Sequence, residues 1–143
     1  MAANTVPIFS KQGLNQWIGP MLTANTTKDL TSGTSYLLCT ADATNGSRIE
    51  RIILQPVGSN IATLMRFWLN NGAVTTTATN QAYMFDVALV STTSSETASM
   101  PAVVLSGAPY PFPLVMKAGY KIYVTVATGI AAGFMGVALG GDY

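Results

Sequence analysis

Apolar and polar residues alternate in short runs along most of the chain, which is the pattern of strands with one buried face. The runs are rich in β-branched and aromatic residues, turn residues separate them, and no stretch has the period of an amphipathic helix. This pattern predicts a single all-β domain, an antiparallel sandwich of about eight strands. The candidate strands are 15–23, 35–41, 47–57, 62–70, 82–90, 101–105, 111–116, 120–127 and 132–139.

The connections between these strands have chemical causes. Asn45-Gly46 and Asn70-Asn71-Gly72 supply residues that accept positive φ, so both should end strands in turns. The three prolines between positions 109 and 113 lack the amide donor that a central strand needs, which predicts an edge or crossing segment. The Thr- and Ser-rich tracts 73–80 and 91–99 should be surface loops at the ends of the sandwich.

Alternation also predicts which side chains face the core. In strand 82–90 the expected inward residues are Tyr83, Phe85, Val87 and Leu89, and the outward ones are Met84, Asp86 and Ala88. The run 64–69 differs, because it is apolar on both faces except for Arg66. One face of that strand should therefore meet the core and the other a partner, which makes Phe67 and Trp68 candidate partner-binding residues.

Charge is scarce and balanced. Seven Lys or Arg face six Asp or Glu, and charged residues make up 9% of the chain against roughly a quarter in ordinary domains. Without a basic field, nucleic-acid binding is not expected. A surface so poor in charge suggests burial against neighbouring subunits; the alternative is a soluble monomer coated with hydroxyl and amide groups.

The uncharged stretch 122–141 is as long as a membrane-spanning helix. Its five glycines and its strand-like alternation favour two strands joined near Thr128-Gly129, so no membrane contact is expected. Cys39 is the only cysteine and lies in an apolar run, which predicts a buried, inert thiol and a fold without a disulfide.

The chain contains no histidine, which removes the usual general base and the Ser-His-Asp relay. No phosphate-binding glycine motif is present either. We therefore expect no enzyme activity and no cofactor. A two-carboxylate glycosidase and a calcium site at Asp29 and Asp42 are alternatives, but solvated loop carboxylates are the simpler interpretation. Glu50 stands between Arg48 and Arg51 and is most simply part of a cross-strand or same-face charge pair. The six acidic residues are Asp29, Asp42, Glu50, Asp86, Glu96 and Asp142.

Aromatic residues could form a platform on which sugars stack, but at strand spacing they are more often core or interface residues. The positions of Trp17 and Trp68 distinguish a sugar-binding platform from an assembly interface. Adjacent indoles on a groove with carboxylates would favour sugar binding, whereas indoles that face neighbouring subunits would favour assembly. The aromatic candidates are Trp17, Trp68, Tyr36, Tyr110, Tyr120, Tyr123 and Tyr143.

Residues 1–14 are predicted to be an N-terminal arm that precedes the folded domain, residues 15–143. The arm carries Val6, Ile8 and Phe9 with no charge before Lys11, so a lone monomer would have little against which to bury them. We expect these three residues to bind a neighbouring subunit or a coat protein. Alternatively, Ile8 and Phe9 fold back and close one end of their own core.

Six stretches spread along the chain are similar to segments of a known family: Met1-Ala2-Ala3-Asn4-Thr5, Thr23-Ala24-Asn25-Thr26-Thr27-Lys28-Asp29, Ala43-Thr44-Asn45-Gly46-Ser47, Arg66-Phe67-Trp68-Leu69-Asn70-Asn71-Gly72, Ala118-Gly119-Tyr120-Lys121-Ile122 and Gly140-Gly141-Asp142-Tyr143. Through these stretches the sequence resembles a family of small tailed-bacteriophage virion proteins. The C-terminal segments 118–124 and 133–136 are in addition similar to the last strands of tumour-necrosis-factor and complement-type jelly rolls.

These resemblances imply a jelly-roll sandwich that forms a homotrimer and acts as a capsid decoration (cement) protein. Such a protein would be located in the virion and would stabilise the head by binding the phage coat protein. The alternative function is a carbohydrate- or receptor-binding β-sandwich module on the phage tail or head surface. Both functions accept the same fold, so the fold does not choose between them.

Overall fold

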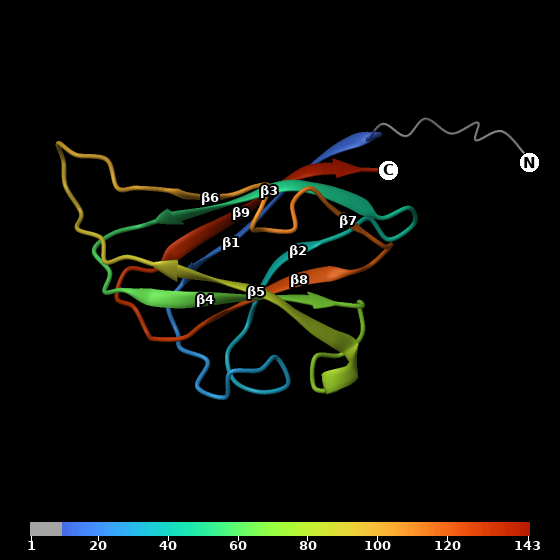
Figure 1. Ribbon diagram of the computed structural model, residues 1–143, viewed down its shortest axis with the longest axis horizontal. Coiled ribbons are helices and arrows are strands. Elements are labelled where there is room, and N and C mark those ends of the chain that lie inside the picture. The colour runs from blue at the N-terminus through green and yellow to red at the C-terminus, as the bar shows by residue number, and fades with distance from the viewer. Residues whose placement is uncertain (1–9) are drawn as a thin grey trace, which may run out of the picture.

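The computed structural model describes residues 10–143 and confirms the predicted antiparallel β-sandwich. Two sheets pack face to face, with the chain crossing repeatedly between them (Figure 1). Within residues 10–143 the only helical element is a short 3-10 turn, Ala78–Asn80. The strands are β1 (Gln12–Met21), β2 (Tyr36–Thr40), β3 (Ser47–Pro56), β4 (Thr63–Asn70), β5 (Gln81–Leu89), β6 (Val103–Leu105), β7 (Leu114–Met116), β8 (Lys121–Val126) and β9 (Phe134–Asp142).

Each strand range expected from the alternation pattern overlaps one of these strands, in the same order. The five-stranded sheet has the order β1-β9-β3-β6, and β7 also pairs with β3. The four-stranded sheet has the order β2-β8-β4-β5. Pairing is nested from the ends of the chain inward, because β1 pairs with β9, β2 with β8, β3 with β6 and β7, and β4 with β5.

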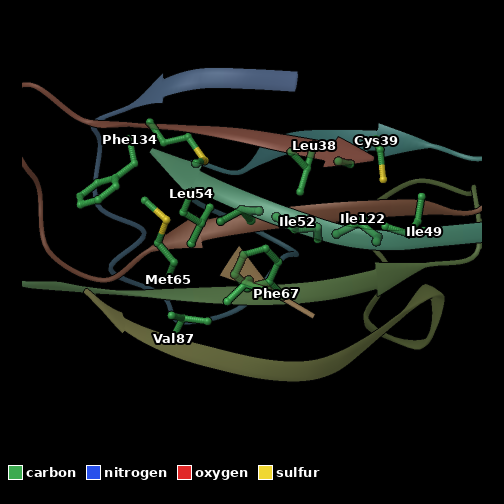
Figure 2. Packing of buried hydrophobic residues seen from close by; sticks show 14 of the residues in the cluster. Leu38, Cys39, Ile49, Ile52, Leu54, Met65, Phe67, Val87, Ile122 and Phe134 are labelled. Carbon is green, nitrogen blue, oxygen red and sulfur yellow. The ribbon is translucent and has the colours of Figure 1, made fainter. Parts of the chain in front are cut away.

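The core fills the space between the two sheets (Figure 2). Ile52 and Leu54 of β3 point into it from one sheet, and Met65 and Phe67 of β4 from the other, all four without solvent exposure. Phe67 stacks on Phe85 of β5, with ring centroids 4.8 Å apart. Burial of such side chains is the main stabilising contribution in a fold that has no disulfide.

The two terminal strands extend beyond their predicted limits. β1 begins at Gln12, so residues 12–14, which were assigned to the arm, belong to the sandwich. β9 continues to Asp142, which pairs with Gln12. The backbone N–H of Lys11 also donates to the carbonyl oxygen of Asp142 over 2.7 Å. The start of β1 and the end of β9 therefore form backbone hydrogen bonds with each other.

A β-bulge in β5 overturns two of the predicted side-chain orientations. Phe67 lies opposite Phe85, but the next residue, Trp68, lies opposite Tyr83, so Met84 is the extra residue. Phe85, Val87 and Leu89 face the core as predicted. Beyond the bulge the alternation reverses, so Met84 packs against the core while Tyr83 is 49% exposed. For this reason the predictions that Tyr83 points inward and that Met84 points outward are both wrong.

The uncharged segment 122–141 forms β8 and β9 rather than a helix, as its alternation predicted. Among residues 10–143, no helix is long and apolar enough to cross a membrane. The proline-rich segment connects β6 to β7, and its Tyr110 and Phe112 pack against Phe85.

Candidate functional site: the outer faces of the two sheets

An apolar row crosses the outer face of the five-stranded sheet; we call it the Trp17 row. Trp17 of β1 lies opposite Val137 of β9, Val137 opposite Ile53 of β3, and Ile53 opposite Val104 of β6. The row faces outward, because the flanking residues of β3 point into the core. Trp17 is 67% and Val104 50% exposed. These four aligned apolar side chains form a continuous surface. Single exposed apolar residues are common on proteins, whereas a continuous apolar surface indicates an interaction site.

A second row, the Trp68 row, crosses the outer face of the four-stranded sheet. Leu37 of β2 lies opposite Tyr123 of β8, Tyr123 opposite Trp68 of β4, and Trp68 opposite Tyr83 of β5. The rings of Trp68 and Tyr83 pack edge to face, with centroids 5.1 Å apart. The indole N–H of Trp68 donates to Oγ1 of Thr125 over 3.1 Å. This hydrogen bond holds the indole against its own sheet.

The structure separates the two residues that the sequence offered as a partner-binding pair. Phe67 is fully buried between the sheets and stacks on Phe85, so it has no surface to offer a partner. Its assignment as a partner-binding residue is corrected to a core role. Trp68 lies on the outer face and stays a candidate. The other candidates, Val6, Ile8 and Phe9, lie outside the described residues.

Comparison of the chain with protein-family models, with curated proteins and with solved structures found no match. The expected relationship to phage virion proteins therefore stays a prediction. The function has to be inferred from the chain's own surfaces, above all the two rows and the places where acidic residues gather.

The two tryptophans do not share a groove. Trp17 belongs to the five-stranded sheet and Trp68 to the four-stranded sheet (Figure 1). A shallow cleft of about 350 Å³ beside Trp17 is lined by Asn15, Gln16, Leu37 and Leu38, and no carboxylate lines it. The paired-indole platform with carboxylates, which would have favoured sugar binding, is not what these two residues form.

Two of the acidic residues stabilise their own loops. Oδ1 of Asp29 accepts hydrogen bonds from the backbone N–H groups of Ser32 and Thr31, each over 3.1 Å, and the bond from Ser32 contributes most to lowering the pKa of this carboxyl group. Asp42 likewise accepts from the N–H groups of Asn45 and Thr44, which lower its pKa. A carboxylate that accepts hydrogen bonds from the N–H groups two and three residues later stabilises the turn that follows it, which is a structural role.

Asp42 and Asp142, far apart in sequence, are brought together around Ser47. The hydroxyl of Ser47 accepts from the N–H of Asp42 over 2.8 Å and donates to Oδ1 of Asp142. A polar pocket of about 290 Å³ lies here, lined in part by Lys11 and Tyr143. No group of three or more Cys, Asp or Glu side chains within residues 10–143 is placed to hold a metal ion.

Two further groups singled out in the sequence, Glu50 and Cys39, are paired or buried. Nε of Arg48 lies 2.6 Å from Oε1 of Glu50 on the outer face of β3, so the predicted charge pair between Glu50 and an adjacent Arg is confirmed. Cys39 is buried, as predicted. Burial raises the pKa of its thiol to about 12, which keeps it protonated and unreactive at neutral pH.

Sequence reasoning missed the Trp17 row as a surface. The signal that could have revealed it is that β3 and β6 contain adjacent apolar pairs, Ile52-Ile53 and Val103-Val104. Such pairs place one apolar residue on each face of a strand.

Proposed function

We propose that this chain is a structural virion protein of a bacteriophage, a capsid decoration or cement subunit that binds its neighbours through the outer faces of its sheets. The observation that carries the proposal is the Trp17 row, an outward-facing apolar surface across four strands that is exposed at Trp17 and Val104 and half-buried between them, in a chain with few charges. Contact with a neighbour would remove this surface from water, which is the main favourable contribution to protein association.

The nested strand pairing supports the finer proposal that the fold is a jelly roll. In that arrangement four antiparallel pairs are rolled up together, and the two halves of the roll form the two sheets. The pairs β1/β9, β2/β8, β3/β6–β7 and β4/β5 match this description. The arrangement also places β1 and β9, the first and last strands of the described residues, side by side in the five-stranded sheet.

We propose further that the assembled form is a homotrimer and that the arm reaches a coat subunit. The sandwich begins at Gln12, paired with Asp142, so the preceding residues start from the end of the five-stranded sheet. Val6, Ile8 and Phe9 are the arm residues proposed to bind the coat protein. Trp68, with the more exposed Tyr83 beside it, is the proposed contact on the opposite sheet.

Electron microscopy of purified particles decides whether the protein is a virion component. Particles made with the gene present should show a density on the head that is absent from particles made after its deletion, and the purified protein added back should restore that density. Particles of identical appearance and protein composition with and without the gene would contradict the proposal.

Self-association is tested by a charge in the Trp17 row. Trp17→Asp should weaken association by about 30-fold or more, a loss of about 2 kcal/mol, because the carboxylate would lose its hydration in the contact. Sedimentation velocity at micromolar concentration measures this. Val90→Asp is the matched control, because Val90 is also 67% exposed and lies outside both rows. An unmodified protein that sediments as a single 15.0 kDa chain would exclude the trimer.

A different feature of the structure, a groove beside Tyr123, supports the alternative function, a carbohydrate- or receptor-binding module. This groove, at one end of the four-stranded sheet, combines an aromatic ring with hydroxyl groups and one positive charge.

A further inference from the structure

The groove is lined by the loop between β4 and β5 and by the start of β8. Figure 1 shows these two segments at the same end of the four-stranded sheet. The groove is shallow and open to solvent, with a volume of about 410 Å³. The loop residues 72–76 form one wall, and the side chains of Lys121 and Tyr123 form the other.

The loop wall is held in place by side-chain amides from β4, from the 3-10 turn and from β5. Oδ1 of Asn70 accepts from the N–H of Gly72 over 2.8 Å. On the other side, Nδ2 of Asn80 donates to the carbonyl oxygen of Val74 over 2.9 Å, and Nε2 of Gln81 to that of Thr75 over 3.0 Å. A wall that is already ordered loses little conformational entropy when a ligand binds.

The groove offers three kinds of contact. Lys121 is the only charged residue that lines it, and its ammonium group has a single long hydrogen bond to the chain, 3.4 Å to the carbonyl oxygen of Gly72. At least two of its three N–H donors are therefore free for a ligand. Tyr123 provides an aromatic ring, with Trp68 directly opposite on the next strand. Thr75 and Thr76 provide hydroxyl groups.

We propose that this groove binds an acidic saccharide, a pyranose that bears a carboxylate. The apolar face of the sugar ring would pack on Tyr123, its hydroxyl groups would bond to the threonines, and its carboxylate would pair with Lys121. The charge is what selects the ligand class: no acidic residue lines the groove to repel a carboxylate, and the lone ammonium group attracts one. The groove contains no residue of the Trp17 row, so saccharide binding and self-association are tested independently of each other.

Nuclear magnetic resonance titration of the isotope-labelled full chain tests the proposal, with tetragalacturonate as the acidic probe and maltotetraose as the neutral one. Tetragalacturonate should shift the amide signals of residues 72–76, 121 and 123, with a Kd of about 1 mM or tighter. Maltotetraose should bind about tenfold more weakly. Equal binding of both probes, shifts confined to other residues, or no shift at about 20 mM probe would overturn the proposal.

Variants assign the roles within the groove. Lys121→Gln should weaken tetragalacturonate binding about tenfold and leave maltotetraose binding unchanged, whereas Lys117→Gln, an equal loss of charge on an exposed residue outside the groove, should change neither. Tyr123→Ala should weaken both probes about fivefold, and Tyr123→Phe, which keeps the ring, should restore binding. Retention of full affinity in both Lys121→Gln and Tyr123→Ala would overturn the proposal.

Discussion

Replacing Phe67 with alanine is expected to lower the free energy of unfolding by about 3 to 5 kcal/mol, the usual cost of a deleted core aromatic. Phe67 has no exposed surface, and its ring stacks on Phe85. Its removal leaves a cavity between the two sheets that neighbouring strands can fill only in part. Urea denaturation followed by tryptophan fluorescence measures the change.

Trp68→Ala is the matched comparison, because it removes a larger side chain from the next position of the same strand. This variant loses the hydrogen bond to Thr125 and the contact with Tyr83, so we expect a cost of about 1 to 2 kcal/mol. Because Trp68→Ala removes a fluorophore, the comparison of the two variants uses urea denaturation followed by circular dichroism in place of fluorescence. If Trp68→Ala were the more destabilising of the two, the assignment of Phe67 to the core and Trp68 to the surface would be wrong.

Gly140→Ala is expected to destabilise the protein by about 3 kcal/mol or more, because overpacking against a fixed backbone cannot relax. A Cβ atom at this position would overlap the carbonyl oxygen of Arg48 and lie 2.9 Å from Cα of Ile49. Both atoms belong to the backbone of β3, which pairs with β9 at this point. Relief would require the two strands to separate where both chain ends join the five-stranded sheet.

Gly13→Ala controls for the general effect of adding a methyl group to a strand glycine. Gly13 lies in β1 opposite Gly141, and the nearest atom to an added Cβ would be Nδ2 of Asn15, 3.7 Å away. We expect this variant to unfold within about 0.5 kcal/mol of the unmodified protein. Thermal unfolding of both variants gives the comparison; equal melting temperatures would show that the close approach at Gly140 is relieved at no cost.

Strand positions could be read from the sequence because they depend on local chemistry. Alternation of side chains is a property of each strand by itself, and the turn at Asn45-Gly46 follows from residues that accept positive φ. The failure at Tyr83 has a non-local cause. The bulge at Met84 arises from how β5 pairs with β4, and one extra residue reverses every later orientation in that direction.

The candidate surfaces could be predicted only in part, for the same reason. The outward position of Trp68 follows from alternation around Phe67, yet alternation alone could not say which of the two faced the core. The Trp17 row could not be found this way, because its members at positions 17, 53, 104 and 137 become neighbours only through strand register.

Composition and the two-residue period of a strand are enough to predict an all-β domain with few charges, a buried thiol and no histidine relay, because both can be read residue by residue along the chain. Which apolar side chains stay on the surface, how Asp42 and Asp142 meet at Ser47, and where the groove beside Tyr123 lies all depend on the tertiary structure. These features join segments that are distant along the chain, and only the register between paired strands brings such segments into contact.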